Sequence, residues 1–266
     1  MPAQASSREW DANSYHQVSD PQLSWGKKVL SRLNLRGNEV LMDAGCGTGR
    51  LTGELLERLP NGFVVGVDLS QNMLTTARDS LSPEFGLRAC FVAADLQDLP
   101  FERSFDGIFS TAAFHWVPDH RRLFRSLFHA LRPGGWLRAQ CGGGPNLARL
   151  RERMDALMTS PKYARFFPGF RNPWVFNDAP TAANLLRKAG FVEVETSVEE
   201  AFTLLESAEA YSEFIRTAVF RIHLPRISEP SLRAEFVAEM VRQAGHDTPP
   251  YSLDYWRLNL SATVPA

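Results

Sequence analysis

The sequence predicts an α/β fold, in which seven strands form a mostly parallel sheet with helices on both faces. Two observations support this fold class. Short apolar runs of strand length alternate with segments whose apolar residues recur at helical spacing. The first two runs also carry an acid at their ends, Asp43 and Asp68, where open sheets of this kind bind ligands.

The stretch from Val40 to Gly49 carries the strongest local signal. Apolar residues and Asp43 precede three glycines at alternate positions, Gly45, Gly47 and Gly49. Leucines then recur on one helical face up to Leu59, so we predict a strand, a glycine loop and a helix. Glycines in such a loop let the backbone approach a ligand, and some of these positions require positive φ.

Loops of this kind bind dinucleotides or other adenosine compounds. The dinucleotide fingerprint requires a third glycine where Arg50 stands. Asp43 at the strand end would also repel a pyrophosphate and attract an ammonium group. A ligand with adenosine at one end and an amino acid at the other, such as S-adenosylmethionine, therefore fits the loop better.

Residues Val40 to Gly49 resemble the first motif of the class I S-adenosylmethionine-dependent methyltransferases. This resemblance implies a Rossmann-like sheet with a helical substrate cap, and S-adenosyl-L-methionine as the cofactor. It covers the chain from about Trp10 to Cys141. The residues before Val40 form a predicted helical cover, in which Tyr15 and Trp25 either pack on the core or shield the cofactor, because aromatic faces attract a sulfonium cation.

The second predicted strand runs from Phe63 to Asp68. Asp68 lies close to the distance from the glycine loop at which an acid accepts hydrogen bonds from ribose hydroxyls. It could instead cap the next helix, but Ser70 suits that position better. Leu69 and Met73 are then expected to flank the adenine, although each could also belong to the core.

The third predicted strand, Leu87 to Ala94, precedes Asp95 and Leu96. The resemblance implies that Asp95 accepts from the adenine amino group and that the backbone N–H of Leu96 meets a ring nitrogen. Asp98 is the alternative acid, although it lies further from the strand end.

The fourth predicted strand, Gly107 to Phe109, leads into a loop at the carboxyl edge of the sheet, where we expect the chemistry. Ser110 is a candidate cofactor contact, and His115 and Trp116 are candidate catalytic residues. His115 is either a structural or binding residue or a general base, and a carboxylate acceptor would need no base. Trp116 is expected to form a wall of the methyl-transfer chamber.

A helix from Arg121 to Leu131 and a fifth strand from Trp136 to Cys141 follow. The predicted organisation is a single domain. It comprises cover helices (1–37), a core (38–144), a cap insertion (145–180), further core (181–203), a second cap insertion (204–250) and a last strand (251–262), antiparallel to the sixth strand at 191–203. The aromatic residues of 161–180 form either a satellite core or the substrate pocket. Arg216, Arg221 and Arg226 are expected on a solvated helix face rather than against an anionic substrate.

The composition is that of an ordinary enzyme of 266 residues. Its net charge of −1 shows no excess of basic residues of the kind that favours binding to nucleic acid or to an anionic membrane. Three widely spaced cysteines predict reduced thiols rather than a disulfide framework or a metal site. The first ten residues lack an apolar run of signal-peptide length, so we expect a cytoplasmic monomer or homodimer that acts on a small molecule.

The whole chain, including His115-Trp116 and the segment from Pro173 to Phe176, is similar to a small-molecule subgroup that includes the trans-aconitate and juvenile-hormone acid methyltransferases. That similarity implies O-methylation of a carboxylic acid by in-line displacement. A C- or N-methyltransferase of specialised metabolism is the main alternative. A nicotinamide-dependent oxidoreductase and a non-catalytic protein with the cofactor fold are further alternatives.

Overall fold

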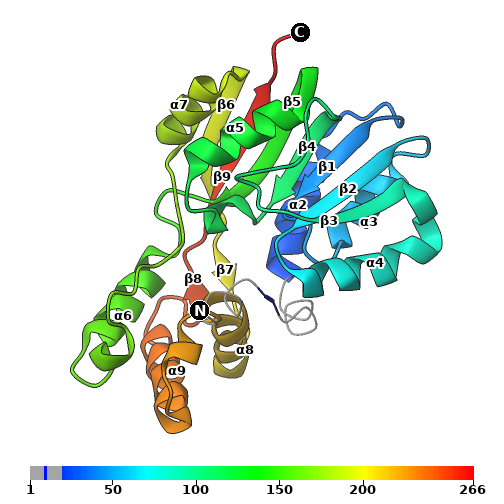
Figure 1. Cartoon of the computed structure of the whole chain (residues 1–266). Helices are drawn as coiled ribbons and strands as arrows, with labels where there is room; N and C mark the ends of the chain where they lie inside the picture. The colour runs from blue at the N-terminus through cyan, green and yellow to red at the C-terminus, as the bar shows by residue number, and fades with distance from the viewer. Residues whose placement is uncertain (1–8, 11–19) are drawn as a thin grey trace.

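The computed structural model describes residues 9–10 and 20–266, and a seven-stranded sheet forms its centre (Figure 1). The strand order is β3-β2-β1-β4-β5-β9-β6, and neighbouring strands are parallel except where β9 pairs with β5 and β6. The predicted fold class is therefore confirmed. The predicted cofactor contact Tyr15 lies outside the described residues. The strands are Val40–Ala44 (β1), Phe63–Asp68 (β2), Ala89–Ala93 (β3), Phe105–Thr111 (β4), Leu131–Gly142 (β5), Val192–Glu200 (β6) and Trp256–Thr263 (β9).

Helices cover both faces of the sheet because its central strands are apolar on both sides. Leu41 and Met42 are neighbours on β1, and they belong to the cores on opposite faces. One core includes residues of α2 (Asp20–Ser31), α3 (Arg50–Glu57) and α4 (Gln71–Phe85), and the other includes residues of α5 (His120–Ala130) and α7 (Ala179–Ala189) (Figure 1). No helix in the described ranges has the length and apolar character to cross a membrane.

Several strand boundaries differ from those predicted: the fourth strand is longer at both ends, the last begins later, at Trp256, and three others differ for identifiable reasons. The third strand is shorter at its start, because 86–88 form a 3₁₀ turn. The fifth begins earlier, because Leu131 pairs with Phe105 across a register shift. The sixth ends at Glu200, and the following Thr203–Leu204 (β7) leaves the main sheet to pair with Ser252–Leu253 (β8). In each case a partner strand or a local turn decides the boundary, which apolar alternation alone does not indicate.

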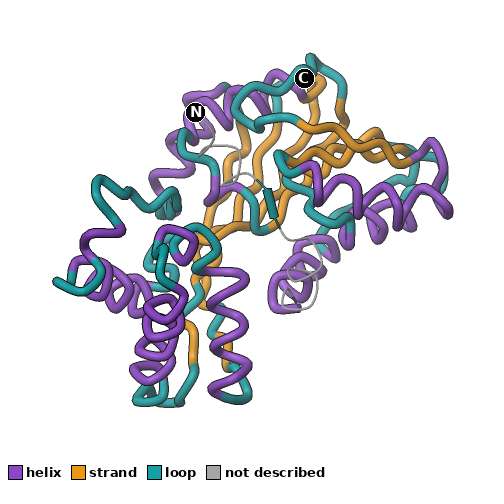
Figure 2. Tube along the Cα trace, turned by 60° about the horizontal axis from the view of Figure 1, so that its bottom comes forward, coloured by secondary structure: helices purple, strands orange, loops and turns teal. Residues whose placement is uncertain are grey.

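The two predicted cap insertions form one lobe beyond the carboxyl end of the parallel strands. It contains α6 (Ala148–Thr159), α8 (Ala208–Phe214) and α9 (Pro230–Ala244), and it stands apart from the sheet in both views (Figure 1 and Figure 2). Its core joins side chains from both insertions, such as Met154 and Met240, with Trp25 of α2. Phe167 belongs to this core, while Trp174 and Phe176 line a pocket, so the aromatic segment contributes to both a second core and a pocket wall.

Candidate active site

The glycine loop after β1 is held against the end of β2. The N–H groups of Gly45 and Cys46 both donate to the carbonyl of Val67, at 2.7 and 3.0 Å. Gly45 has a φ of +80°, and a Cβ built on it would lie 2.2 Å from the Cβ of Ala113. Any side chain at this position would displace the segment after β4, so only glycine lets the two segments meet.

The other two glycines of the loop differ in their surroundings. Gly49 has a φ of +81°, and a Cβ there would lie 3.0 Å from the Cβ of Ala77 in α4. Gly47 has a φ of +54°, and nothing lies within 4 Å of its Cβ position. Packing therefore requires glycine at position 49, whereas at position 47 the loop leaves open backbone that a ligand can approach.

Asp68 ends β2 with its carboxylate against the loop. Its Oδ2 accepts from the Gly47 N–H at 3.0 Å and its Oδ1 from the Ser70 N–H at 2.9 Å. Burial raises the pKa of Asp68, and these hydrogen bonds oppose that shift. A carboxylate has about four acceptor positions, so Asp68 keeps capacity for the predicted ribose hydroxyls. Ser70 caps α4 as predicted, its Oγ accepting from the Met73 N–H at 3.3 Å.

Asp43 lies beneath the loop rather than on its surface, contrary to the expectation that it faces the ligand. Its side chain is 2% exposed, and its Oδ2 accepts from the Thr52 hydroxyl at 2.6 Å. Burial raises the pKa of Asp43 to about 7. The bond from Thr52 opposes this shift and the charge of Asp68 adds to it. The carboxylate therefore ties β1 to α3 and acts on a ligand only through its field.

The two predicted adenine neighbours lie in different environments. Leu69, next to Asp68, is 41% exposed, whereas Met73 is buried. An exposed leucine beside a candidate ribose acceptor provides apolar surface for a base without any rearrangement. Met73 is covered by the protein itself, so its predicted contact would need a movement of the surrounding side chains.

The two residues that are predicted to form hydrogen bonds with adenine, Asp95 and Leu96, follow β3. Asp95 Oδ1 accepts from the Gln97 N–H at 2.9 Å, and the side-chain amide of Gln97 contacts both carboxylate oxygens. The Leu96 N–H donates to no acceptor within the described ranges, so it is available to a ligand. Ser110 is buried and donates to the Ala44 carbonyl at 2.6 Å, which joins β4 to β1.

A pocket lies between the carboxyl ends of β4 and β5 and the cap. It encloses about 50 Å³, which is the room of about one or two water molecules, so a larger acceptor requires side chains of the wall to move. Its described lining contains the candidate catalytic residues His115 and Trp116. The other lining residues are Trp10, Gln22, Ala112, Asn146, Leu147, Trp174, Phe176, Ala218, Val219, Tyr255 and Arg257.

The backbone around this pocket is strained at two points. Ala112 and Leu147 both line it, and they have φ values of +56° and +54°. Non-glycine residues adopt such values rarely, and they gather at functional sites. Ala112 is held by its N–H bond to the Gln140 carbonyl at 2.8 Å, and Ala113 after it packs on Gly45, so the pocket adjoins the glycine loop.

His115 presents a neutral ring to the pocket. Its Nδ1 accepts from the Gly142 N–H at 3.3 Å, so the proton of the neutral ring is assigned to Nε2. Burial lowers the pKa of His115 well below 6.5, and the charges of Arg257 and His120 add to that shift. At neutral pH the ring is therefore a hydrogen-bond donor through Nε2.

His120 fixes the turn that carries His115. Its Nε2 lies 2.9 Å from the Phe114 carbonyl and its Nδ1 lies 2.7 Å from the side-chain nitrogen of Asn177. Both contacts are satisfied when Nε2 donates and Nδ1 accepts. The Val175 N–H also donates to the His115 carbonyl at 2.9 Å, so the segment before α7 is attached directly to this turn.

Glu9 and Trp10 bridge the start of α4 and the cap. The Glu9 carboxylate accepts from the Ser70 hydroxyl at 3.0 Å, and the Trp10 ring meets the Trp116 ring edge to face, with centroids 5.3 Å apart. The guanidinium of Arg221 lies 3.8 Å from the centre of the Trp10 ring and donates to the Glu9 carbonyl at 3.0 Å. The expectation that Arg221 lies on a solvated face is therefore wrong, and burial lowers its pKa to about 10.

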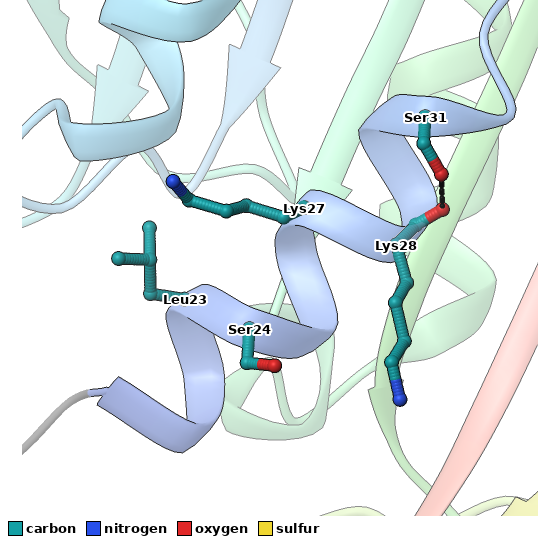
Figure 3. Close-up of a pocket in the computed structure, with 5 residues that line it drawn as sticks. All are labelled: Leu23, Ser24, Lys27, Lys28 and Ser31. Carbon is teal, nitrogen blue, oxygen red and sulfur yellow. Dashed lines mark hydrogen bonds between the residues drawn. The ribbon is translucent and has the colours of Figure 1, made fainter.

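A second hollow, on the surface of α2, does not form a site. Its lining residues, Leu23, Ser24, Lys27, Lys28 and Ser31, all come from this one helix (Figure 3). Lys27 and Lys28 point in different directions in that view, and the Ser31 hydroxyl donates to the Lys28 carbonyl at 2.8 Å (Figure 3). Side chains that diverge from a single helix do not surround a ligand.

Comparison with known proteins agrees with this geometry. Residues 41–135 match the family described as "Methyltransferase domain". The trans-aconitate 2-methyltransferase of Rhodococcus jostii is 33% identical over 68% of this chain and 69% of that protein. The enzyme of the same name from Deinococcus radiodurans is 38% identical over 49% of this chain and 48% of that protein, so this chain spans only about half the length of that relative.

The fold also agrees with a solved structure. The Haemonchus contortus phosphoethanolamine N-methyltransferase 2, in complex with S-adenosyl-L-methionine, superimposes with a TM-score of 0.63 at 19% identity, over 96% of this chain and 57% of that one. The chain belongs to the class I S-adenosylmethionine-dependent methyltransferases. Its similar proteins include those of the trans-aconitate type, which confirms the predicted resemblance, and its cofactor is S-adenosylmethionine.

Arg257 is a residue of the pocket that the sequence analysis missed. It lies on β9 between Trp256 and Leu258, in a strand where polar and apolar residues alternate. Such alternation predicts a solvent-facing arginine. Only the packing shows that Arg257 is 3% exposed, with its guanidinium carbon 4.5 Å from the centre of the Trp25 ring.

We expect Gly47→Ala to weaken S-adenosylmethionine binding at least about tenfold, or about 1.4 kcal/mol, because the new methyl group would occupy the space left for the ligand. The unliganded protein should lose only about 1–2 kcal/mol of stability from the left-handed backbone. Calorimetry measures the affinity and urea unfolding the stability.

Gly134→Ala is the matched control, because Gly134 also has a positive φ, +73°, and open surroundings, but it lies at the amino end of β5. Its stability loss should be similar and its affinity for the cofactor unchanged. A Gly47→Ala protein with wild-type affinity would show that the ligand does not approach the loop there.

We expect the stability of Asp43→Asn relative to the wild type to increase by about 1 kcal/mol between pH 6 and pH 8. The folded pKa of Asp43, about 7, lies above the usual 3.8, so its ionisation costs stability. That cost is absent below about pH 3.8 and grows until the pH passes 7, whereas asparagine does not titrate. Urea unfolding of both proteins at both pH values measures it, and a constant difference would refute the titration.

Proposed function

We propose that the protein transfers a methyl group from S-adenosylmethionine to a carboxylate oxygen of a small organic acid. The pocket lined by His115 and Trp116 is the proposed binding site of the acid, here called the acceptor pocket. Its composition carries this proposal. Among its described lining residues, Arg257 is the permanently charged side chain, and neither aspartate nor glutamate is present. Such a pocket attracts an anionic acceptor and disfavours an amine cation. The names of the similar trans-aconitate methyltransferases also support an acid.

Arg257 is suited to bind the carboxylate. Its guanidinium stacks on Trp25, whose ring packs against Tyr255 with centroids 4.9 Å apart. A planar guanidinium held on a ring has a defined orientation, and its geometry matches that of a planar carboxylate. The proposed role of Arg257 is therefore to orient the acid in the pocket.

Bound S-adenosylmethionine supplies an electrophilic methyl carbon, to which the carboxylate oxygen forms its bond as the carbon–sulfur bond breaks, giving a methyl ester and S-adenosylhomocysteine. An ionised carboxylate has no proton to lose, so no side chain needs to act as a base. The protein then contributes orientation and the exclusion of water.

His115 fits this reaction as a donor rather than as a base. Its lowered pKa keeps the ring neutral, and its Nδ1 is occupied by the Gly142 N–H, so Nε2–H remains for an acceptor oxygen. We therefore assign to His115 the role of holding the carboxylate together with Arg257. Trp116 forms the wall beside it, with ring centroids 5.6 Å apart.

The groups proposed to bind the cofactor still have unused hydrogen-bonding positions or accessible surface. Gly47 provides open backbone, Asp68 further acceptor positions, Leu96 a backbone N–H and Leu69 exposed apolar surface. Asp95 completes the set as the proposed partner of the adenine amino group.

A direct test incubates the purified protein with methyl-labelled S-adenosylmethionine and a panel of carboxylic acids, phenols and amines. Mass spectrometry identifies the product, and mild alkali distinguishes esters, which hydrolyse, from ethers and methylamines, which do not. We expect an alkali-labile product from an acid. Methylation confined to phenols or amines would overturn the proposal.

We expect His115→Ala to raise KM for the acid about tenfold or more, because a hydrogen bond to a charged oxygen is lost, with a smaller effect on kcat. His115→Gln, which keeps an N–H donor, should recover part of the loss. From pH 6.5 to 8.5 the wild type and His115→Gln should have kcat/KM profiles of the same shape, because His115 does not titrate there and the titration of Asp43, with a pKa of about 7, is common to both proteins. A wild-type profile that rises with a histidine pKa and disappears in His115→Gln would instead identify a general base.

A further inference from the structure

We infer that Asn146 binds the acid in the acceptor pocket, its side-chain N–H donating to the carboxylate beside the Nε2–H of His115. This inference rests on the proposed function and assigns a further residue to the same site. Asn146 follows three glycines and Pro145 in the connection from β5 to α6, and this sequence context by itself indicates only a turn. The tertiary contacts of Asn146 carry the inference.

One hydrogen bond fixes the orientation of the Asn146 amide. Its Oδ1 accepts from the Trp256 N–H at 2.9 Å. Because a backbone N–H only donates, the oxygen of the amide and not its nitrogen must face Trp256. The Nδ2 group is therefore the other end of the amide, and its two N–H bonds remain for other partners.

The Asn146 Nδ2 group has no hydrogen-bond acceptor in the part of the chain that the structure describes. Asn146 nevertheless lines the acceptor pocket and is only 2% exposed. Buried donors in folded proteins nearly always have a partner, and leaving one without a partner costs about 1–3 kcal/mol. A ligand that brings an oxygen into the pocket would remove this cost, so the Nδ2 group is a binding position for such an oxygen.

Asn146 and His115 lie against the same glycine of β5. The Gly142 N–H donates to His115 Nδ1 at 3.3 Å. A Cβ built on Gly142 would lie 2.9 Å from Asn146 Nδ2 and 2.7 Å from Cε1 of Phe176. A side chain at position 142 would thus displace the amide, and glycine lets both donors reach the pocket from neighbouring positions.

The backbone on both sides of the Asn146 side chain is held in place. The Asn146 N–H donates to the Gly143 carbonyl at 3.3 Å, and the Leu147 N–H donates to the Asp254 carbonyl at 2.8 Å. Leu147 keeps a φ of +54°, a costly value that occurs at functional sites. The amide is therefore positioned before a ligand arrives, and it breaks no bond of its own to bind one.

Two neutral donors suit a carboxylate that acts as the nucleophile. They can hold the acid without protonating it. A carboxylate group also matches the pocket of about 50 Å³, the room of one or two water molecules, whereas the body of a larger acid requires wall side chains to move. The carboxylate is a stronger hydrogen-bond acceptor than the ester it becomes, so these contacts weaken during transfer. Losing one should raise KM more than it lowers kcat.

Asn146→Asp tests the contact because aspartate keeps an oxygen for the Trp256 N–H and replaces only the donor, by a second oxygen. We expect kcat/KM for the best acid of the panel to fall at least about 100-fold, mainly through KM, because like charges then meet. The affinity for S-adenosylmethionine should stay within about threefold, which also shows that the variant folds.

Asn172→Asp is the matched control. The Asn172 Oδ1 also accepts from a backbone N–H, that of Trp174 at 3.2 Å, but Asn172 is not among the described lining residues of the pocket. The same substitution there adds the same charge near the pocket and leaves the proposed contact intact. Its kcat/KM should change less than about fivefold.

Binding of acetate to the S-adenosylhomocysteine-loaded protein tests the contact without turnover. Trp116 and Trp174 line the pocket, so tryptophan fluorescence reports the titration. Asn146→Asp and Gly142→Ala should bind acetate at least about tenfold more weakly than the wild type and Asn172→Asp. Gly142→Ala displaces the amide without changing it, so it also serves if Asn146→Asp does not fold. Equal binding by all four proteins, or none by the wild type, would contradict the inference.

The outcomes separate this inference from the proposed function. If the wild type methylates an acid and Asn146→Asp has the same KM as Asn172→Asp, the inference is overturned and the proposed function stands. If Asn146→Asp lowers kcat with KM unchanged, Asn146 supports the pocket without binding the acid, and the inference is again overturned. If no acid reacts and a phenol or an amine does, the proposed function fails and this inference with it.

Discussion

The attachment of the glycine loop to the end of β2 is the interaction on which the rest of the site depends. Two N–H groups of the loop share the Val67 carbonyl, and a third, from Gly47, binds the Asp68 carboxylate. These bonds hold the open backbone of the loop beside the candidate ribose acceptor. Asp43 supports the loop from below through Thr52, and Ala113 packs on it from the β4 side.

A second set of contacts, made mainly of hydrogen bonds, links the glycine loop to the wall of the acceptor pocket. Ala113 precedes the turn that holds His115, and His120 fixes the same turn to the segment containing Trp174 and Phe176. The loop after β1 and the wall of the acceptor pocket are thus linked through one short segment after β4. A methyl transfer requires such a link, because displacement depends on the relative position of two bound molecules.

Burial gives the ionisable groups of the site unusual properties. It raises the pKa of Asp43 to about 7 and lowers that of His115, so neither behaves as an ordinary charged residue at neutral pH. The Arg257 guanidinium is buried against the Trp25 ring. Among the residues that the structure describes, the pocket is therefore largely aromatic, and Arg257 is its arginine, which is the environment that the proposed transfer to an acid calls for.

The sequence by itself determined the alternation of strands and helices, the glycine loop, and the arrival of Asp68, Asp95, His115 and Trp116 at the carboxyl edge of the sheet. Local apolar periodicity and chain direction decide these features. Only the tertiary structure decided that Asp43 is beneath the loop, that the two cap insertions share one core, and that Arg257 faces the acceptor pocket. These features depend on contacts between residues far apart in the chain, such as Arg257 with Trp25, whose burial no local pattern encodes.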